Sequence, residues 1–548
     1  MEPIFTDKQL NNMSREDLIS LMKIVQEQTK KKDTEIQLLK EKQKELEFLN
    51  AMLSDRLTLA QRKQFGASSE KYAEGYEQMN LFNEAEASAD AETEELFEEI
   101  RPSSYKRKKR KGKKEEDLSN FETVETRTYK LEGEARYCPE CGKKYNVVTK
   151  EIVKRLRFVP AKFAVEEEIT YVYSCPKCGS MKRPEKEPSL IRGSIATPSL
   201  VAGIMNAKYV NGMPLARQER EFARYDLDLS TKTMANWIIN CADRYLKPLY
   251  QLMKEELLES RYIHCDESRI QVLGEPEQKG TTQNWMWVYL TDEFSGSPQM
   301  VLFDYERTRA GYHPVNFLGN RFHGYLTCDG YQAYHSLGEG IIISGCLTHA
   351  RRRFDAALTA LKKDFTKEQL KETVAYQAMS RIGILYKIEE MLHDKTPEEK
   401  YEERQKQSRP VMDAMFEWLH TMEDSVDRSS LIGDAILYTL NQEVYLRRYL
   451  EDGHLSIDNN SAERALKNFA VGRRNWLFAK SVRGADASAL VYSITETALL
   501  NNLKPYAYLT YILDELRKMG AFPKEEELKK LLPWSEYLPE YCRTKLKK

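Results

Sequence analysis

Two apolar runs that each end in Cys-Asp, residues 262–266 and 324–329, set the strongest constraint on how this chain can fold. They lie in a stretch, residues 260–345, where short apolar segments alternate with polar ones. Three strands in a meander followed by helix–strand alternation indicate a mixed α/β sheet. We predict strands at 262–265, 285–290, 299–303, 324–328 and 341–345, with helices near 311–319 and 330–336.

In such a sheet the first and fourth strands lie side by side. Asp266 and Asp329 each follow a predicted strand directly, so we expect their carboxylates to converge. Two such carboxylates and a third from a nearby helix can hold two Mg²⁺ ions (or Mn²⁺) about 4 Å apart. Hard cations prefer oxygen ligands, and Mg²⁺ leaves positions open for a substrate phosphate. The pattern therefore indicates metal-dependent chemistry on a phosphodiester.

The third carboxylate is harder to choose from spacing. Glu463 lies just inside a predicted helix start within residues 456–464, and it is our first candidate. Asp458 is a rival for this place, although it can instead cap that helix, which is a structural role. Glu496, in the middle of a predicted helix, could equally be the third ligand. Further rivals from spacing alone are Glu267 and Asp304.

Two C-x-x-C-G knuckles predict a separate metal site. Four thiolates in two such pairs form a closed tetrahedral zinc site, which is structural rather than catalytic. The apolar stretch at 163–173 between the knuckles looks like a strand, so we expect a zinc ribbon holding one Zn²⁺. The predicted ligands are Cys138, Cys141, Cys175 and Cys178.

The next stretch, residues 186–258, reads as helices. One helix is expected at 199–210, another from Pro214, and a third at 231–246 with Ser230 as its cap. A short break at 225–229 between the last two fits a helix-turn-helix. The residues near the end of the last helix that faces the DNA groove would then be Lys232, Thr233 and Asn236. The alternative is an ordinary helical connector, because many of these have the same pattern.

The N-terminal part combines a helix with a charged linker. Residues 36–60 carry a short heptad pattern, which indicates either self-association or one helix packed on its own protein. Residues 84–99 hold eight acids and no base, and residues 106–114 hold eight bases and no acid. This linker is either solvated or in contact with phosphates. The chain as a whole has 84 basic and 85 acidic residues, so no net charge attracts nucleic acid.

Two basic motifs lie near the predicted acids in sequence. Cys346-x-x-His349 is followed by a run of arginines, and a second basic turn follows the Glu463 helix. Either motif could hold a phosphate, and the alternative for each is a solvated surface turn. The basic candidates for DNA contact are His349, Arg351, Arg352, Arg464, Arg473 and Arg474.

Several motifs, in order, give the chain a specific resemblance to bacterial transposases of the insertion sequence 66 family. The resemblance runs from about residue 35 to 515. The motifs that carry it are Asp266-Glu267-Ser268, Cys328-Asp329-Gly330-Tyr331, Cys346-x-x-His349-Ala350-Arg351-Arg352, Ile457-Asp458-Asn459-Asn460-x-Ala462-Glu463-Arg464 and Gly472-Arg473-Arg474-Asn475-Trp476.

The resemblance implies a DDE transposase with an RNase H-like catalytic core. By position, Asp266, Asp329 and Glu463 match the family's acidic triad, with Asp458 left as the cap. The family also implies recognition of terminal inverted repeats and of target DNA, a homo-oligomer in the synaptic complex, and companion proteins of the same element. A non-enzymatic DNA-binding regulator and an inactive element remnant are the alternatives.

The expected organisation follows from these segments. Nine cysteines are too few for a disulfide scaffold and indicate a reducing compartment. With no signal peptide and no run of about 18 apolar residues, we expect a protein of the bacterial cytoplasm, associated with the nucleoid when bound to DNA. The expected parts are a helical region (1–83), linker (84–118), zinc ribbon (119–185), helix-turn-helix domain (186–258), catalytic domain (259–500, with a helical insertion at about 360–440) and helical tail (501–548).

Overall fold

The computed structural model describes residues 163–174, 181–182, 184–277, 282–338, 340–362, 364–520 and 523–545, together with Glu140 and Lys143. The chain divides into two compact units, one of residues 101–186 and one of the remainder. The predicted heptad helix, the charged linker and all four knuckle cysteines lie outside the described residues.

In the smaller unit the described residues form a short hairpin. Strand β1 (Tyr173–Ser174) pairs antiparallel with β2 (Met181–Lys182). The prediction of a strand across 163–173 is wrong for all but its last residue. Val165 and Ile169 are 89% and 74% exposed, so neither contacts a core. Among the described residues no strand pairing begins before Tyr173, and an apolar pattern alone does not provide the partner that a strand needs.

Helices precede the sheet in the larger unit, and local signals fix their ends. Thr197 Oγ1 accepts the N–H of Leu200 at 3.2 Å. Ser230 Oγ accepts the N–H of Thr233 at 3.2 Å, as predicted for a cap. The predicted helices are confirmed, with π-helical turns inside two of them. They are α6 (Pro198–Met205), η2 (Asn206–Val210), α7 (Leu215–Ala223), α8 (Thr231–Cys241), η3 (Ala242–Leu246) and α9 (Lys247–Glu259).

The sheet of this unit has the order β5-β4-β3-β6-β7. Strand β4 is antiparallel to β3 and β5, whereas β3, β6 and β7 run parallel. The mixed sheet is confirmed, and so is the adjacency of its first and fourth strands. The elements are β3 (Tyr262–Gln271), β4 (Gln283–Thr291), β5 (Met300–Glu306), α10 (Tyr312–Leu318), β6 (Gly324–Cys328), η4 (Gln332–Ser336) and β7 (Ile341–Gly345).

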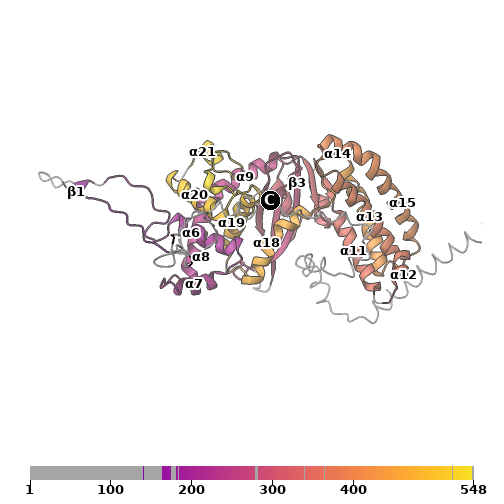
Figure 1. Cartoon of the computed structure of the whole chain (residues 1–548), viewed down its shortest axis with the longest axis horizontal. Coiled ribbons are helices and arrows are strands. Elements are labelled where there is room, and N and C mark those ends of the chain that lie inside the picture. Colours follow the sequence, from indigo (N-terminus) through magenta and orange to yellow (C-terminus); the bar gives the residue numbers. More distant parts are fainter. Residues whose placement is uncertain are drawn as a thin grey trace, which may run out of the picture. The chain divides into compact units, whose positions relative to one another are not determined.

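Two helices from the C-terminal part of the chain pack on this sheet. Helix α18 (Asn460–Trp476) lies against β3 and β4, and α19 (Val482–Leu500) lies against β5. Figure 1 shows both beside the strands, although they come more than 150 residues after β5. This arrangement brings the Glu463 region onto the sheet that carries the two aspartates.

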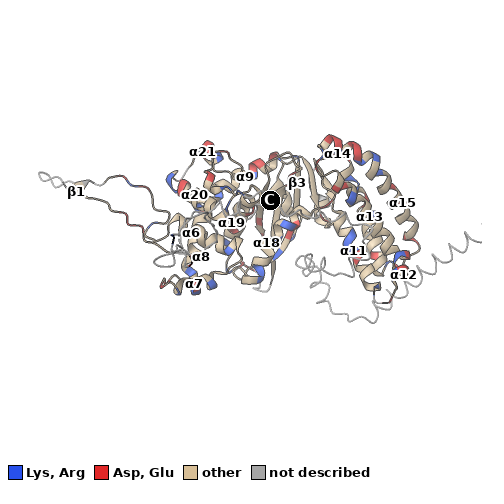
Figure 2. Cartoon of the chain, in the orientation of Figure 1, with Lys and Arg blue, Asp and Glu red and all other residues tan. Residues whose placement is uncertain are grey.

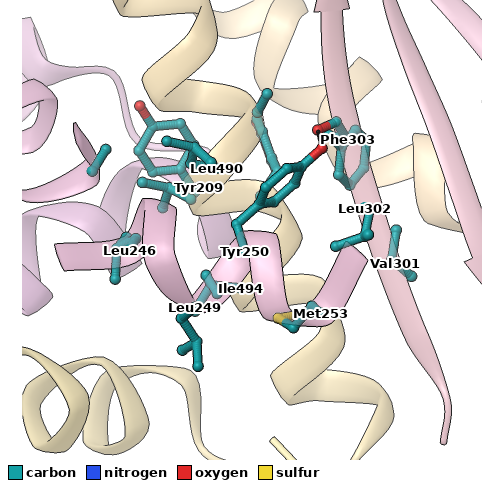
Figure 3. Close-up of a cluster of buried hydrophobic side chains, with 14 of the residues drawn as sticks. Tyr209, Leu246, Leu249, Tyr250, Met253, Val301, Leu302, Phe303, Leu490 and Ile494 are labelled. Atoms are coloured by element: carbon teal, nitrogen blue, oxygen red, sulfur yellow. Dashed lines mark hydrogen bonds between the residues drawn. The ribbon is translucent and has the colours of Figure 1, made fainter. Parts of the chain in front are cut away.

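The edge strand β5 is closed by side chains rather than by another strand. Thr497 Oγ1 accepts the N–H of Val301 at 3.0 Å, and Ser493 Oγ accepts the N–H of Phe303 at 2.8 Å. On the same strand the Tyr250 hydroxyl donates to the Phe303 carbonyl at 3.0 Å, within a buried apolar cluster (Figure 3). Satisfying an edge in this way prevents pairing with further strands.

After β7 the chain builds a helical group with its own core (Figure 1). The buried Arg404 pairs with Glu389 at 2.6 Å and donates to the carbonyls of Tyr449, Asp452 and Leu455. It thereby ties the group to the segment that leads into α18. The helices, confirming the prediction for 347–425 and 430–450, are α11 (Leu347–Leu361), α12 (Lys367–Glu372), α13 (Val374–Met391), α14 (Pro397–Glu403), η5 (Arg404–Ser408), α15 (Arg409–Glu423), α16 (Leu431–Asn441), α17 (Glu443–Leu446) and η6 (Arg448–Leu450).

The tail is helical near its start, as predicted. It contains α20 (Pro505–Lys518), α21 (Glu525–Lys529) and η7 (Glu540–Cys542). The buried Tyr508 hydroxyl donates to the Leu531 carbonyl at 2.7 Å and holds the tail together. In the described parts of the chain, no helix has the length and apolar character that crossing a membrane requires.

Candidate active site

Asp266 lies on one of two neighbouring parallel strands, and Asp329 directly follows the other. The pairing of β3 with β6 ends at His264 and Thr327, and each aspartate comes two residues after its member of this pair. Neighbouring strands lie about 4.8 Å apart. Asp329 directly follows β6, as predicted. Asp266 does not end its strand, because β4 continues to pair with β3 beyond it.

Helix α18 covers the face of β3 to which Asp266 belongs. Successive side chains of a strand point to opposite faces, so His264, Asp266 and Ser268 share one face. His264 Nδ1 lies 2.9 Å from Asn459 Oδ1, just before α18. At the far end of the helix, Arg473 Nη1 lies 3.4 Å from Ser268 Oγ. These two contacts lie on either side of Asp266 along β3, so helix α18 passes over the aspartate.

The residue before α18 anchors the helix to the sheet. Asn459 Nδ2 donates to the Cys265 carbonyl at 2.9 Å, and its backbone N–H donates to Cys346 Sγ at 3.2 Å. Its carbonyl accepts the N–H of Glu463 at 3.2 Å, which forms the first helical turn. One asparagine thus fixes the position of Glu463 relative to β3 and to the end of β7.

The charges of the other two predicted acids both act on Asp266. Burial raises the pKa of Asp266 well above its usual value, and the negative charges of Glu267, Asp329 and Glu463 raise it further. The N–H of Glu267 donates to Asp266 Oδ1 at 2.8 Å and acts in the opposite direction. Like charges packed this closely in a buried place call for a positive counter-charge.

The rival acids have other contacts. Asp458 does not occupy the cap position of α18, which belongs to Asn459, so the prediction of Asp458 as the cap is wrong in position. Its carboxylate accepts the N–H of Asn460 at 3.1 Å. Glu496, on α19, accepts from Asn468 Nδ2 at 3.1 Å, more than one helical turn beyond Glu463. Neither rival is among the charges that act most strongly on Asp266.

Glu267 faces the other side of β3, and its side chain is fully buried. It accepts from Arg309 Nε at 2.5 Å and from the Tyr334 hydroxyl. Burial first, and then the charge of Asp329, raise the pKa of Glu267 to about 7, although Arg309 and Tyr334 oppose the shift. Arg309 also lies 3.8 Å from Asp329 Oδ2 and stacks 3.8 Å from the centre of the Tyr331 ring. Sequence reasoning missed Arg309, which belongs to no motif.

The Glu463 carboxylate is only partly satisfied. Its Oε2 pairs with Arg352 of α11. Its Oε1 is buried and, among the described residues, has no hydrogen-bond partner, while His349 Nε2 stands 4.0 Å away. A buried carboxylate oxygen without a partner, close to two further carboxylates, is a donor set that suits a hard cation such as Mg²⁺.

Those acids are not already arranged as metal ligands. In the part of the chain that the structure describes, no three His, Cys, Asp or Glu side chains stand in the arrangement of a metal centre. The metal-bridging arrangement predicted for Glu463 therefore stays a prediction. Pairing with Arg352 is one physical reason, because it holds one of the two carboxylate oxygens.

The predicted basic residues fall into two groups around this site. His349, Arg351 and Arg352 lie on α11, and Arg464, Arg473 and Arg474 lie on α18; Figure 2 shows blue positions on both helices. Arg351, Arg464 and Arg474 are exposed. Burial and the charges of Arg474 and Arg269 lower the pKa of Arg473. Helix α18 thus carries positive charge at its exposed surface.

The predicted helix-turn-helix residues lie at the start of α8. Lys232 and Asn236 are exposed and share one face of the helix, because they are four residues apart. The Thr233 hydroxyl lies 2.9 Å from Ser230 Oγ and is part of the cap. Lys232 and Asn236 remain available for contact with a groove, whereas Thr233 mainly stabilises the helix start.

Comparison with known protein families gives matches along most of the chain. The family model described as "Transposase IS66 family" matches residues 193–487, which is more than half of the chain. The chain belongs to the IS66 family of transposases. The "IS66 C-terminal element" matches residues 493–534 and so extends past residue 515, where the resemblance in the sequence ended.

Two further IS66 models match the N-terminal part. The "zinc-finger binding domain of transposase IS66" matches residues 135–179, which include all four knuckle cysteines. The model described as "Transposase C of IS166 homeodomain" matches residues 52–120. A zinc-finger region and an N-terminal DNA-binding-like region thus precede the IS66 transposase region.

Three curated relatives, all from Sinorhizobium fredii (strain NBRC 101917 / NGR234), carry only the names of uncharacterized proteins. "Uncharacterized protein y4hP" is 30% identical over 412 residues, covering 72% of this chain and 73% of its own. "Uncharacterized protein y4jD" is 29% identical over 418 residues, covering 74% and 79%. "Uncharacterized protein y4qI" is 29% identical over 395 residues, covering 70% of each.

Proposed function

We propose that this IS66 protein is a DDE-type transposase that binds the terminal inverted repeats of its insertion sequence, cuts the DNA there and joins the freed ends to a target. Asp266, Asp329 and Glu463 are the proposed ligands of two Mg²⁺ (or Mn²⁺) ions. When bound, such ions activate the attacking water or 3′-hydroxyl and offset charge on the leaving oxygen. The observations that carry the proposal are the buried Glu463 oxygen, which has no hydrogen-bond partner among the described residues, and the negative charges of Asp329 and Glu463 that act on Asp266.

The sheet supports an RNase H-like core. Taken in chain order, its strands lie in the order third, second, first, fourth, fifth, and only the second is antiparallel to the others. The first strand carries Asp266, and Asp329 directly follows the fourth, which is its neighbour in the sheet. The helical group after β7 corresponds to the insertion between the second and third acids.

The surrounding residues would orient the carboxylates and the DNA. Asn459 sets the position of Glu463, and Arg352 holds its second oxygen. Arg309 restrains Asp329 from the other side of the sheet while neutralising Glu267. Substrate phosphates approaching the acids would meet the exposed arginines of α18. Each phosphate neutralised adds to the salt dependence of binding.

The remaining parts extend this proposal. We assign one structural Zn²⁺ to Cys138, Cys141, Cys175 and Cys178, and DNA contact to the exposed face of α8. Two element ends must meet before strand transfer, so a homo-oligomer is expected, together with companion proteins of the same element. The protein would act in the bacterial cytoplasm, on the nucleoid.

The test is nicking of a duplex that carries the terminal repeat flanking the gene, with Mg²⁺. We expect the wild-type protein to nick at the element boundary. Glu463→Gln should lose nicking by at least a hundredfold, whereas the matched variant Glu496→Gln should retain it, because Glu496 is bound by Asn468. Loss of nicking in the Glu496 variant with full activity in the Glu463 variant would show that the third acid has been assigned wrongly.

A non-enzymatic DNA-binding regulator is the second candidate. The zinc-finger match and the exposed face of α8 favour DNA binding by themselves. This function predicts specific binding of the terminal repeat that survives Asp266→Asn, with no nicking by the wild-type protein in Mg²⁺ or Mn²⁺. Nicking that depends on Asp266 excludes it.

A further inference from the structure

The loop after α18 presents two large apolar side chains to solvent. Leu477 is 66% exposed and Phe478 is 42% exposed. Leu477 also has φ 66° and ψ −46°, a conformation that L residues rarely adopt. Backbone strain of this kind persists only where the surroundings enforce it. Exposed apolar side chains held under strain need a reason other than packing.

Both sides of this loop are fixed by hydrogen bonds. The N–H of Leu477 donates to the Arg473 carbonyl at 2.7 Å, inside the last turn of α18. On the other side, the N–H of Ala479 donates to the Gln271 carbonyl at 2.8 Å, and the N–H of Leu273 donates to the Ala479 carbonyl at 3.0 Å. The loop is therefore a rigid tip mounted on α18 and on the end of β3.

The turn after β3 packs tightly against the same tip. A Cβ on Gly274 would come within 2.8 Å of the Lys480 carbonyl oxygen. Only glycine allows the two backbone segments to come this close. The tip therefore packs against backbone rather than against flexible side chains. The two apolar side chains at its end are thus held in place before any partner arrives.

Positive charge surrounds the tip. Arg474 and Lys480 flank the two apolar residues and are exposed. Arg473 and Arg269 lie close enough to each other that their charges interact unfavourably. The charges that act most strongly on the pKa of Arg473 are those of two other arginines, Arg474 and Arg269. An apolar point surrounded by arginine and lysine complements a polyanion rather than another protein core.

The tip lies at a definite distance from the acids. Asp266 and Gln271 are five residues apart on β3, or about 17 Å at 3.3–3.4 Å per residue. The bases of a DNA strand are spaced by 3.4 Å. A duplex whose cut phosphate lies at Asp266, and whose axis is parallel to β3, would therefore bring a base step about five base pairs away level with the tip.

We propose that Leu477 and Phe478 form a wedge that enters a base step of duplex DNA about five base pairs from the cut phosphate, with Arg474 and Lys480 on the flanking phosphates. Apolar side chains used in this way partly unstack the step and kink the duplex. The wedge rests on the proposed function for its position relative to the cut. It would bend the DNA so that the scissile phosphate reaches the acids.

The test uses the full chain and a terminal-repeat duplex with 2-aminopurine placed at one position at a time, over ten base pairs on either side of the cut. Ca²⁺ replaces Mg²⁺, so distortion is read without cutting. We expect an increase of about threefold in fluorescence at one step, about five base pairs from the cut. The double variant Leu477→Ala/Phe478→Ala should abolish it, whereas Val444→Ala, which removes an exposed apolar side chain on α17, should not.

A rescue experiment separates a wedge from a general defect. In Mg²⁺ the double variant should nick about tenfold more slowly than the wild-type protein. A duplex with a mismatch at the fluorescent step should restore its rate to within about twofold, because the unstacking cost is already met. Both side chains are exposed, so the melting temperature should not change; Phe478→Ser alone provides a milder variant if it does.

The outcomes distinguish the wedge from the function on which it rests. A flat fluorescence profile, an undiminished signal in the variants, or no rescue by the mismatch would overturn the wedge even if nicking is normal. A change of oligomeric state in the variants without any change in fluorescence would overturn it in favour of a contact between copies of the chain. A localised signal without nicking in Mg²⁺ would leave the wedge standing and overturn the proposed function.

Discussion

Replacing Glu267 by glutamine should make the stability of the folded protein less sensitive to pH between about 4.5 and 7. Burial and the charge of Asp329 raise the pKa of Glu267 from 4.5 to about 7. Between these values the folded protein holds a proton on Glu267 that the unfolded chain has released. The stability that this proton contributes is present at low pH and is lost as the pH rises through the window.

The size of the effect follows from the shift. Each unit of pKa corresponds to about 1.36 kcal/mol, so the full shift of Glu267 amounts to at most about 3 kcal/mol. Its side chain is fully buried, so solvent does not weaken the effect. Glutamine keeps the shape of the side chain and has no such titration. Between pH 5 and pH 8, which covers most of the shift, the wild-type protein should therefore lose about 2.5 kcal/mol more than Glu267→Gln.

Urea unfolding in EDTA, at pH 5 and pH 8, measures this difference. Trp287 is buried in β4 and lies 5.9 Å from Tyr334, so its fluorescence reports on the relevant part of the sheet. The matched control is Glu259→Gln, which removes an exposed acid paired with Arg321 at 3.0 Å. It should behave as the wild-type protein does. Equal pH dependence in the wild-type protein and Glu267→Gln would refute the argument.

Three further changes test other contacts. Tyr250→Phe removes the hydroxyl that satisfies the edge carbonyl of Phe303 and should lower the free energy of unfolding by about 1–3 kcal/mol, measured with urea. Gly274→Ala should cost about 1–3 kcal/mol in the same assay, because its Cβ would press on the Lys480 carbonyl. Arg352→Gln frees the carboxylate of the third acid and should raise Mn²⁺ affinity without DNA up to about fivefold, measured by electron paramagnetic resonance. An unchanged free energy of unfolding, or an unchanged Mn²⁺ affinity, would show that the contact in question does not have the proposed effect.

The sequence predicted the elements well where the pattern is local. Alternating apolar runs gave the five strands of the larger sheet, and the Ser230 cap was correct because it depends on neighbouring residues alone. The end of β3 was predicted too early, because its continuation depends on pairing with β4. The strand at 163–173 failed for the related reason that a pattern does not provide a partner.

In the candidate site, too, the features that follow from local sequence could be predicted, and those that depend on long-range contacts could not. The adjacency of the strands that lead to Asp266 and Asp329 follows from the order of the apolar segments, which sequence reasoning can reach. The contact of Arg309 with the acids depends on where the β5–α10 connection lies in space, and no motif marks it. Asn459 was assigned no role from the sequence, whereas its long-range bonds to β3 and Cys346 position the start of α18. Such contacts become visible only in the folded chain.

The measurement that tests the central claim most directly is cleavage of the polypeptide by Fe²⁺ bound in place of Mg²⁺. With ascorbate and peroxide, bound iron generates radicals that cut the backbone next to its ligands. We expect fragments ending near Asp266, Asp329 and Glu463, suppressed together by excess Mg²⁺ and by Asp329→Asn. Cleavage elsewhere, or cleavage near only one of the three, would contradict the claim that these acids form one metal site.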